Sequence, residues 1–220
     1  MNKCRNTSNK RKKDIILFNK SISKTLLESQ PAVFLDRDGV IIEDCHYIKN
    51  KKNVKLCPGA KDLLRLFFKR KIIVVIITNQ SGITKNYLSW ADYAEVTNQL
   101  ISLLGEPNPI TAIYANSYIS EKPSSNWRKP NPSMIFSAAE TLKLDLKRSV
   151  LIGDRTSDIY AGVNAEIPNI FHVKTGHGAK ERSKIKAKIK EDSFLINSGK
   201  LSKIYFLDTL LEFPLELMPK

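Results

Sequence analysis

From residue 31 onward, short apolar runs alternate with amphipathic stretches. Ala32–Leu35 and Ile72–Ile77 contain no polar side chain, and each run ends in polar residues. Strands that are buried on both faces have this pattern, because helices cover a parallel sheet on both sides. The same pattern predicts three further strands, at residues 110–114, 149–152 and 169–173.

Helices are predicted between these strands. Apolar side chains recur at helical spacing after Pro58-Gly59, and again over residues 89–104, 132–142 and 157–165. Strands that alternate with helices favour an α/β fold, here a Rossmann-like three-layer α/β/α arrangement around a parallel sheet. A last helix is predicted over residues 206–213, near the C-terminus.

Charge separates the two flanks from the centre of the chain. The protein has 36 Lys and Arg against 22 Asp and Glu, a net charge of +14. Residues 1–30 hold eight basic and two acidic residues, and residues 174–203 hold nine and three. Basic runs can bind polyanions, but single-stranded nucleic acids also need aromatic side chains for stacking, and residues 184–190 have none. We interpret both stretches as solvated tails and expect no nucleic-acid partner.

These patterns predict a basic polar extension over residues 1–30 and one domain over residues 31–220. No apolar run approaches the roughly 18–20 residues of a membrane span. The three cysteines, Cys4, Cys45 and Cys57, are too few and too scattered for a disulfide framework or a Cys-rich zinc module. The N-terminus also lacks the pattern of a secretory signal. We therefore expect a soluble, cytoplasmic protein with no membrane partner.

Polar motifs follow three of the predicted strands. They are residues 36–39 (Asp-Arg-Asp-Gly), 78–82 (Thr-Asn-Gln-Ser-Gly) and 153–155 (Gly-Asp-Arg). Ligands of parallel sheets bind beyond the carboxyl ends of the strands, so three aspartates are expected to converge there. Their mutual repulsion would be relieved by a hard divalent cation, for which Mg²⁺ is the best candidate.

A cation at this edge would also attract phosphate. Thr78, Asn79 and Ser81 offer hydrogen-bond donors to phosphate oxygens, and Arg128 and Lys129 could neutralise the remaining charge. Each motif alone also fits a turn or a helix cap. Their order along the chain, each after an apolar strand, favours a site for phosphoryl transfer.

Four motifs resemble those of the haloacid dehalogenase superfamily, most closely its histidinol-phosphate and heptose-bisphosphate phosphatase branch. The motifs are Phe34–Ile41, Ile77–Ile83, Arg128–Pro130 and Ile152–Arg155 with Asp158. The resemblance spans about residues 31–198. No long insertion separates the motifs, so the resemblance implies a haloacid dehalogenase-like fold without a large cap domain, which is compatible with a monomer.

The resemblance implies Mg²⁺-dependent hydrolysis of a phosphomonoester through an aspartyl-phosphate intermediate. Asp36 would be the nucleophile, and Asp38 would protonate the leaving group and then activate water. Thr78 and Lys129 would hold the transferred phosphoryl group. Mg²⁺ would be held by the Asp36 and Asp154 carboxylates and by the backbone carbonyl of Asp38.

A phosphorylated heptose, as used in lipopolysaccharide biosynthesis, is the substrate that the resemblance favours. Histidinol phosphate, a 3′-phosphorylated nucleic acid, or a phospho-ligand that is bound without turnover are the alternatives. Asp158 is expected to support the metal ligands rather than bind the metal, and His46 fits either a substrate contact or an exposed surface histidine. The expected substrate contacts are Asp44, Cys45, His46, Tyr47, Asn79, Gln80, Ser81, Arg128 and Arg155.

One departure from the family concerns zinc. Many members carry Cys and His ligands in a loop before the Arg-Lys-Pro motif. Here that loop begins with residues 115–118 and ends with residues 125–127, and neither part contains Cys or His. We therefore expect no zinc. His172 and His177 are also not expected to bind a metal, since no carboxylate or Cys accompanies them in the sequence.

Overall fold

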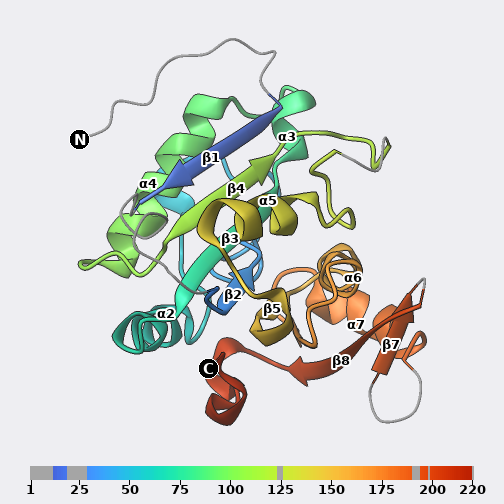
Figure 1. Cartoon of the computed structure of the whole chain (residues 1–220). Coiled ribbons are helices and arrows are strands. Elements are labelled where there is room, and N and C mark those ends of the chain that lie inside the picture. Colours follow the sequence, from blue (N-terminus) through green and yellow to red (C-terminus); the bar gives the residue numbers. More distant parts are fainter. Residues whose placement is uncertain (1–11, 19–28, 123–125, 190–193, 198, 220) are drawn as a thin grey trace.

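The computed structural model describes residues 12–18, 29–122, 126–189, 194–197 and 199–219. Within them, one eight-stranded sheet runs in the order β1-β4-β3-β2-β5-β6-β8-β7 (Figure 1). Neighbouring strands are parallel from β4 to β8, and β1 and β7 pair antiparallel at the two edges. The strands are β1 (Lys13–Leu17), β2 (Ala32–Leu35), β3 (Ile73–Asn79), β4 (Ala112–Asn116), β5 (Val150–Gly153), β6 (Asn169–Val173), β7 (Phe194–Asn197) and β8 (Lys200–Leu207).

The α-helices connect successive strands of the parallel part. The longest, α4, begins after Ser89, whose side chain forms a reciprocal capping box with Asp92 and so fixes where the helix starts. The α-helices are α2 (Ala60–Lys69), α3 (Ser81–Thr84), α4 (Trp90–Leu104), α5 (Ser133–Leu142), α6 (Thr156–Asn164) and α7 (Gly178–Lys186). Short 3₁₀ helices are η1 (Lys51–Asn53), η2 (Leu146–Arg148), η4 (Leu210–Glu212) and η5 (Leu215–Leu217).

Alternate residues of β2 face opposite helical layers. Val33 and Leu35 pack in a core with α2, α4 and the C-terminal 3₁₀ helices. Ala32 and Phe34 pack in a second core with α5, α6 and Ile185 of α7. Because the strand buries both faces, it needs apolar residues at every position. The predicted three-layer α/β/α fold is confirmed.

The sequence predicted that the domain begins at residue 31, but strand β1 lies before that boundary and belongs to the sheet. Residues 13–17 pair with β4 along its whole length, from Lys13 opposite Asn116 to Leu17 opposite Ala112. Ile16 packs on the first core and Leu17 on the second. The strand was missed because only three of its five residues are apolar and it lies among basic residues. The rest of the predicted extension, residues 1–11 and 19–28, lies outside the described residues.

The second basic stretch and the predicted last helix also differ from expectation. Residues 178–186 of the predicted tail form α7, and Ile185 is buried in the second core. Residues 200–207 form β8, which pairs in parallel with β6, so most of the helix predicted over residues 206–213 is replaced by the strand end and a 3₁₀ turn. Long-range strand pairing outweighed the local apolar pattern there.

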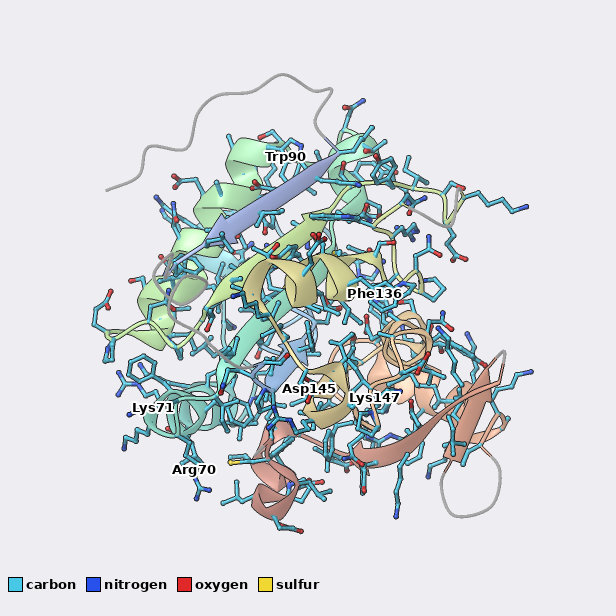
Figure 2. All side chains as sticks on the ribbon, in the orientation of Figure 1. Arg70, Lys71, Trp90, Phe136, Asp145 and Lys147 are labelled. Carbon is cyan, nitrogen blue, oxygen red and sulfur yellow. The ribbon has the colours of Figure 1, made fainter. Side chains whose placement is uncertain are left out.

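The amino and carboxyl ends of the parallel strands carry different residues. Arg70 and Lys71 follow α2 at the amino ends of the strands, are exposed, and are labelled in Figure 2. The carboxyl ends carry Asp36, Thr78 and Asp154 instead. Among the described residues, no helix combines the length and the apolar character that crossing a bilayer requires.

Candidate active site

Three strand ends meet at the carboxyl edge of the sheet. Asp36 follows β2, Thr78 lies near the end of β3, and Asp154 follows β5. Because β2 pairs in parallel with both β3 and β5, these side chains lie at the same end of the sheet. A cavity of about 260 Å³ opens there. It is lined by Asp36, Arg37, Asp38, Asp44, His46, Tyr47, Ile48, Asn79, Gln80, Ser81, Arg128, Lys129, Arg155, Ser157, Asp158 and His177.

The Asp36 carboxylate is buried and held in place by two groups. Its Oδ1 accepts a hydrogen bond from the backbone N–H of Arg37 at 2.7 Å and lies 3.0 Å from Nζ of Lys129. Burial raises the pKa of Asp36 to about 6, and the charge of Lys129 opposes that rise. Asp36 is therefore mainly ionised at neutral pH, which is the form that can act as a nucleophile.

The Lys129 ammonium group is enclosed beside this carboxylate. It donates to the backbone carbonyl of Ile77 at 2.9 Å and lies 2.6 Å from Oδ1 of Asp158. Burial acts to lower the pKa of Lys129, but Asp158 and Asp36 outweigh it, so that the pKa is raised. The result is a fixed positive charge next to Asp36, suited to a phosphoryl oxygen. Asp158 acts on the site through this lysine.

The Asp154 carboxylate completes a group of three. Ligand oxygens of Asp36, Asp154 and Asp158 all lie within 4.8 Å of one another. Burial raises the pKa of Asp154 to about 9, and the charges of Asp158 and Asp36 add to the rise. Its Oδ2 accepts the His177 N–H at 2.7 Å, whereas its buried Oδ1 has no hydrogen-bond partner among the described residues. This donor set fits Mg²⁺, which would satisfy that oxygen and neutralise the cluster.

Two glycines make room for the Asp154 carboxylate. Gly39 and Gly176 have φ angles of +86° and +58°, in the left-handed region. A Cβ atom at either position would lie 2.4 Å from Oδ2 of Asp154. The side chain of Thr175 also donates to the Gly39 carbonyl at 2.5 Å, which joins the two loops. Both loops thus have to remain free of side chains where they enclose the carboxylate.

Gln80 connects the predicted acid–base group to the predicted phosphate-binding hydroxyl. Its Nε2 donates to Oδ2 of Asp38 at 2.7 Å and to Oγ1 of Thr78 at 2.8 Å. The Asp38 side chain is 21% exposed, and Asp38 lines the cavity, whereas Thr78 is buried. Arg37 contacts the same aspartate, with Nη2 at 3.0 Å from Oδ1. The structure therefore brings these predicted residues together.

Asn79 holds the motif that carries Lys129. Its Nδ2 donates to the Lys129 carbonyl at 3.3 Å, and its Oδ1 accepts the Lys129 N–H at 3.2 Å. The same oxygen accepts from Nδ2 of Asn116, at the end of β4. Asn79 also lines the cavity, as predicted, but its polar atoms are used to tie three segments together. The sequence suggested that Asn79 donates hydrogen bonds to phosphate and gave no sign that its side chain binds Lys129 and Asn116.

The cavity mouth is formed by residues that lie far apart in the sequence. Oδ2 of Asp44 lies 2.8 Å from Nε2 of His177 and 3.2 Å from Nη2 of Arg155. The His46 and His177 rings stack with their centroids 5.7 Å apart. Tyr47 is exposed beside them, and its hydroxyl accepts a hydrogen bond from Lys85. Four of the predicted substrate contacts thus surround the entrance.

Arg128 and Cys45 were both predicted to contact substrate, and only Arg128 lines the cavity. Arg128 lines the cavity as expected, and its Nη1 donates to the Tyr118 carbonyl at 3.1 Å, which anchors the guanidinium. Cys45 is exposed and lines a neighbouring cavity beside η1, so the structure does not bring it to the site. His177 was not predicted as a site residue. The signal for it was the glycine-containing loop around it, residues 175–178.

A HAD-hydrolase-like family model matches residues 126–198. The fold and the site define a phosphatase of the HAD hydrolases, the haloacid dehalogenase superfamily. The Campylobacter jejuni protein named D-glycero-alpha-D-manno-heptose-1,7-bisphosphate 7-phosphatase is 34% identical over 143 residues, which are 64% of this chain and 81% of that protein. The chain belongs to the D-glycero-D-manno-heptose-1,7-bisphosphate 7-phosphatase family.

Two further proteins are similar to this chain. A Mesorhizobium japonicum protein, D-glycero-beta-D-manno-heptose-1,7-bisphosphate 7-phosphatase, is 36% identical over 142 residues, which are 61% of this chain and 65% of that protein. The solved D,D-heptose 1.7-bisphosphate phosphatase from B. bronchiseptica, complexed with magnesium and phosphate, is similar with a TM-score of 0.68. That similarity covers 82% of this chain and 93% of the other at 22% identity, and it concerns the fold.

Proposed function

We propose that this enzyme removes the 7-phosphate of D-glycero-D-manno-heptose 1,7-bisphosphate through an aspartyl-phosphate on Asp36. The observation that carries the chemistry is the buried Asp36 carboxylate, placed against Lys129 and within 4.8 Å of Asp154 and Asp158. The names of the relatives support the heptose bisphosphate as substrate, in either anomeric form.

In the first step the Asp36 carboxylate attacks phosphorus and displaces the sugar oxygen. The Lys129 ammonium group and the Thr78 hydroxyl hold the equatorial phosphoryl oxygens, where charge is concentrated. Mg²⁺, when held by the carboxylates of Asp36 and Asp154 and the carbonyl of Asp38, supplies positive charge that neutralises the phosphoryl group.

Asp38 transfers the protons of both steps. It is the one carboxyl group of the catalytic set that is partly exposed, and it faces the cavity. It gives a proton to the leaving sugar oxygen and later takes one from the water that attacks the phosphorylated Asp36. The substrate enters past Asp44, His46, Tyr47 and Arg155, and Arg128 contacts the sugar or its second phosphate.

We further propose that the enzyme acts as a monomer in the cytoplasm. Cys45 and Cys57 are free thiols, as expected in a reducing compartment. The reaction is proposed to need no zinc. In the loop before Arg128, Nδ2 of Asn126 donates to the Ser120 carbonyl at 2.8 Å, which supports a loop closed by hydrogen bonds.

The experiment that tests this function measures inorganic phosphate release in Mg²⁺. Heptose 1,7-bisphosphate, histidinol phosphate and a 3′-phosphorylated oligonucleotide are compared in parallel. We expect a strong preference for the bisphosphate, and loss of turnover with retained Mg²⁺ and phosphate binding in Asp36→Asn. Preference for another substrate would overturn the substrate assignment. Unchanged turnover in the variant would overturn the mechanism, and binding without release from any substrate would point to a non-catalytic binding protein.

A further inference from the structure

In the sequence, Arg37 lies between the two catalytic residues Asp36 and Asp38, and it has no role in the proposed mechanism. Its guanidinium group faces the Asp38 carboxylate along one edge. Nη2 lies 3.0 and 3.1 Å from the two carboxylate oxygens, and Nε lies 3.3 Å from each of them. A two-pronged contact of this kind fixes the plane of a carboxylate as well as its position. A lysine could fix only the position.

The guanidinium group is held by its surroundings. The Arg37 side chain is 1% exposed, and its Cζ lies 5.1 Å from the centre of the Tyr93 ring on α4. Its Nη1 is buried with no hydrogen-bond partner among the described residues. Burial of a charged group is unfavourable unless that group is paired, and Asp38 is the carboxylate that pairs with it here. Helix α4 therefore supports a rigid contact to Asp38.

A second group holds the other side of the same carboxylate. Gln80 donates to Oδ2 of Asp38 from an amide that also reaches the Thr78 hydroxyl. The Gln80 backbone is fixed in turn, because its N–H donates to the Asn116 carbonyl at 2.6 Å. Asp38 is thus oriented from two directions by buried side chains, although its own carboxylate faces the cavity.

We propose that Arg37, assisted by Gln80, is a positioning residue that orients Asp38 for proton transfer. The inference rests on the function proposed above. In the first step the bond between phosphorus and the sugar oxygen breaks as Asp36 bonds to phosphorus, and the Asp38 proton moves to the sugar oxygen. Asp38 becomes a carboxylate, and the Arg37 contact stabilises the negative charge as it forms.

The second step restores the starting state. Water attacks phosphorus, the bond between phosphorus and Asp36 breaks, and one water proton moves to the Asp38 carboxylate. Inorganic phosphate leaves, and Asp38 is again protonated. The same contact thus holds the aspartate while it gives a proton and while it takes one. Orientation is valuable here because proton transfer requires hydrogen-bond distance and alignment.

This role predicts a dependence on the leaving group. A sugar alkoxide is a poor leaving group and needs the proton from Asp38, whereas p-nitrophenolate leaves without one. The ratio kcat/KM covers the steps up to formation of phosphorylated Asp36, so it isolates the first proton transfer. In Arg37→Met we expect kcat/KM for heptose 1,7-bisphosphate to fall about 100-fold, at the low end for general acid–base catalysis, and for p-nitrophenyl phosphate to fall less than about threefold.

Three comparisons separate positioning from folding. Arg37→Lys keeps the charge and should recover part of the lost activity toward the bisphosphate. Gln80→Met should show the same selective loss at smaller size, and it serves if Arg37→Met does not fold. Arg182→Met is the matched control, since Arg182 also pairs with an aspartate, Asp208 at 2.7 Å, and lies over an aromatic ring, Phe206. This variant should change kcat/KM for both substrates by the same factor or leave both unchanged.

If folded Arg37→Met loses kcat/KM equally for the two substrates, the inference is overturned. An added loss when Arg37→Met is combined with Asp38→Asn would also overturn it, because a positioning residue acts only through the residue that it positions. Failure of the proposed function looks different. In that case the unmodified enzyme does not release phosphate from the bisphosphate, or Asp36→Asn retains full turnover, before any Arg37 variant is measured.

Discussion

Nζ of Lys129 lies 3.0 Å from Oδ1 of Asp36, and both side chains are almost fully buried. The pair joins the loop before α5 to the end of β2. Lys129 is also the nearest positive charge to Asp158, at 2.6 Å. One ammonium group therefore compensates two buried carboxylates, and it leaves the third, Asp154, to a metal ion.

Replacing this lysine should damage both stability and turnover. Lys129→Met leaves two buried carboxylates without their cation, so we expect the free energy of unfolding to fall by about 3 kcal/mol. kcat should fall at least about 100-fold, since a charge that binds the phosphoryl group is lost. Denaturant unfolding and phosphate release measure the two effects. A variant with normal turnover would show that Lys129 does not contact the phosphoryl group.

Stability of the metal-free protein should depend on pH in a particular direction. The pKa of Asp154 is raised from 3.8 to about 9 by burial and by neighbouring carboxylates. The folded protein therefore keeps a proton that the unfolded chain loses above about pH 4, and this contribution to stability is lost as the pH rises toward 9. Melting temperatures in EDTA should fall between pH 6 and pH 8.5, and Mg²⁺ should reduce the fall. A flat profile in EDTA would contradict the assignment.

The affinity for Mg²⁺ should rise with pH for the same reason. Binding requires the Asp154 carboxylate, so each ion displaces about one proton below pH 9. One displaced proton corresponds to about a tenfold gain in apparent affinity per pH unit. Calorimetry in two buffers of different ionisation enthalpy would measure the proton release directly. The absence of proton release at pH 7 would show that the carboxyl group is already ionised.

The close packing around Asp154 can be tested with two glycines. Gly176→Ala would place a Cβ 2.4 Å from Oδ2 of Asp154, so we expect Mg²⁺ affinity to fall at least about tenfold, equivalent to about 1.4 kcal/mol. Gly199→Ala is the matched control, because Gly199 also has a positive φ, +79°, but no atom of the described residues lies within 4 Å of its added Cβ. Both variants should lose about 1 kcal/mol through backbone strain. Equal Mg²⁺ affinities in the two would contradict the packing argument.

Arg128 should distinguish a bisphosphate from a monophosphate. Its guanidinium is anchored by the Tyr118 carbonyl and lines the cavity. Arg128→Met should raise KM for the bisphosphate about tenfold or more, the value of one charge-assisted hydrogen bond, and should leave KM for heptose 7-phosphate nearly unchanged. Steady-state kinetics on both substrates decides. A similar rise for both would assign Arg128 to the sugar or the transferred phosphate.

The sequence predicted the centre of the fold because local pattern and tertiary role agree there. Residues 32–35 and 169–173 form strands with the predicted bounds, since strands that are buried on both faces must be apolar at every position. Asp36, Thr78 and Asp154 could be placed at one edge because the carboxyl ends of parallel strands meet. Asp36→Asn and Thr78→Val are therefore variants that the sequence alone would have suggested.

Tertiary structure decided the rest. Strand β1 forms because its backbone pairs with β4, and its own sequence, with three apolar residues out of five, does not show this. Asn79 and Asp158 both act on Lys129, a residue far from each in the chain. Local propensity reports what one segment can form alone, whereas these contacts depend on which segments the folded sheet brings within hydrogen-bond distance. The sequence by itself therefore determined the central parallel strands, the aspartates and the end of the sheet where they lie. Only the folded chain determined the partners that hold those aspartates in place.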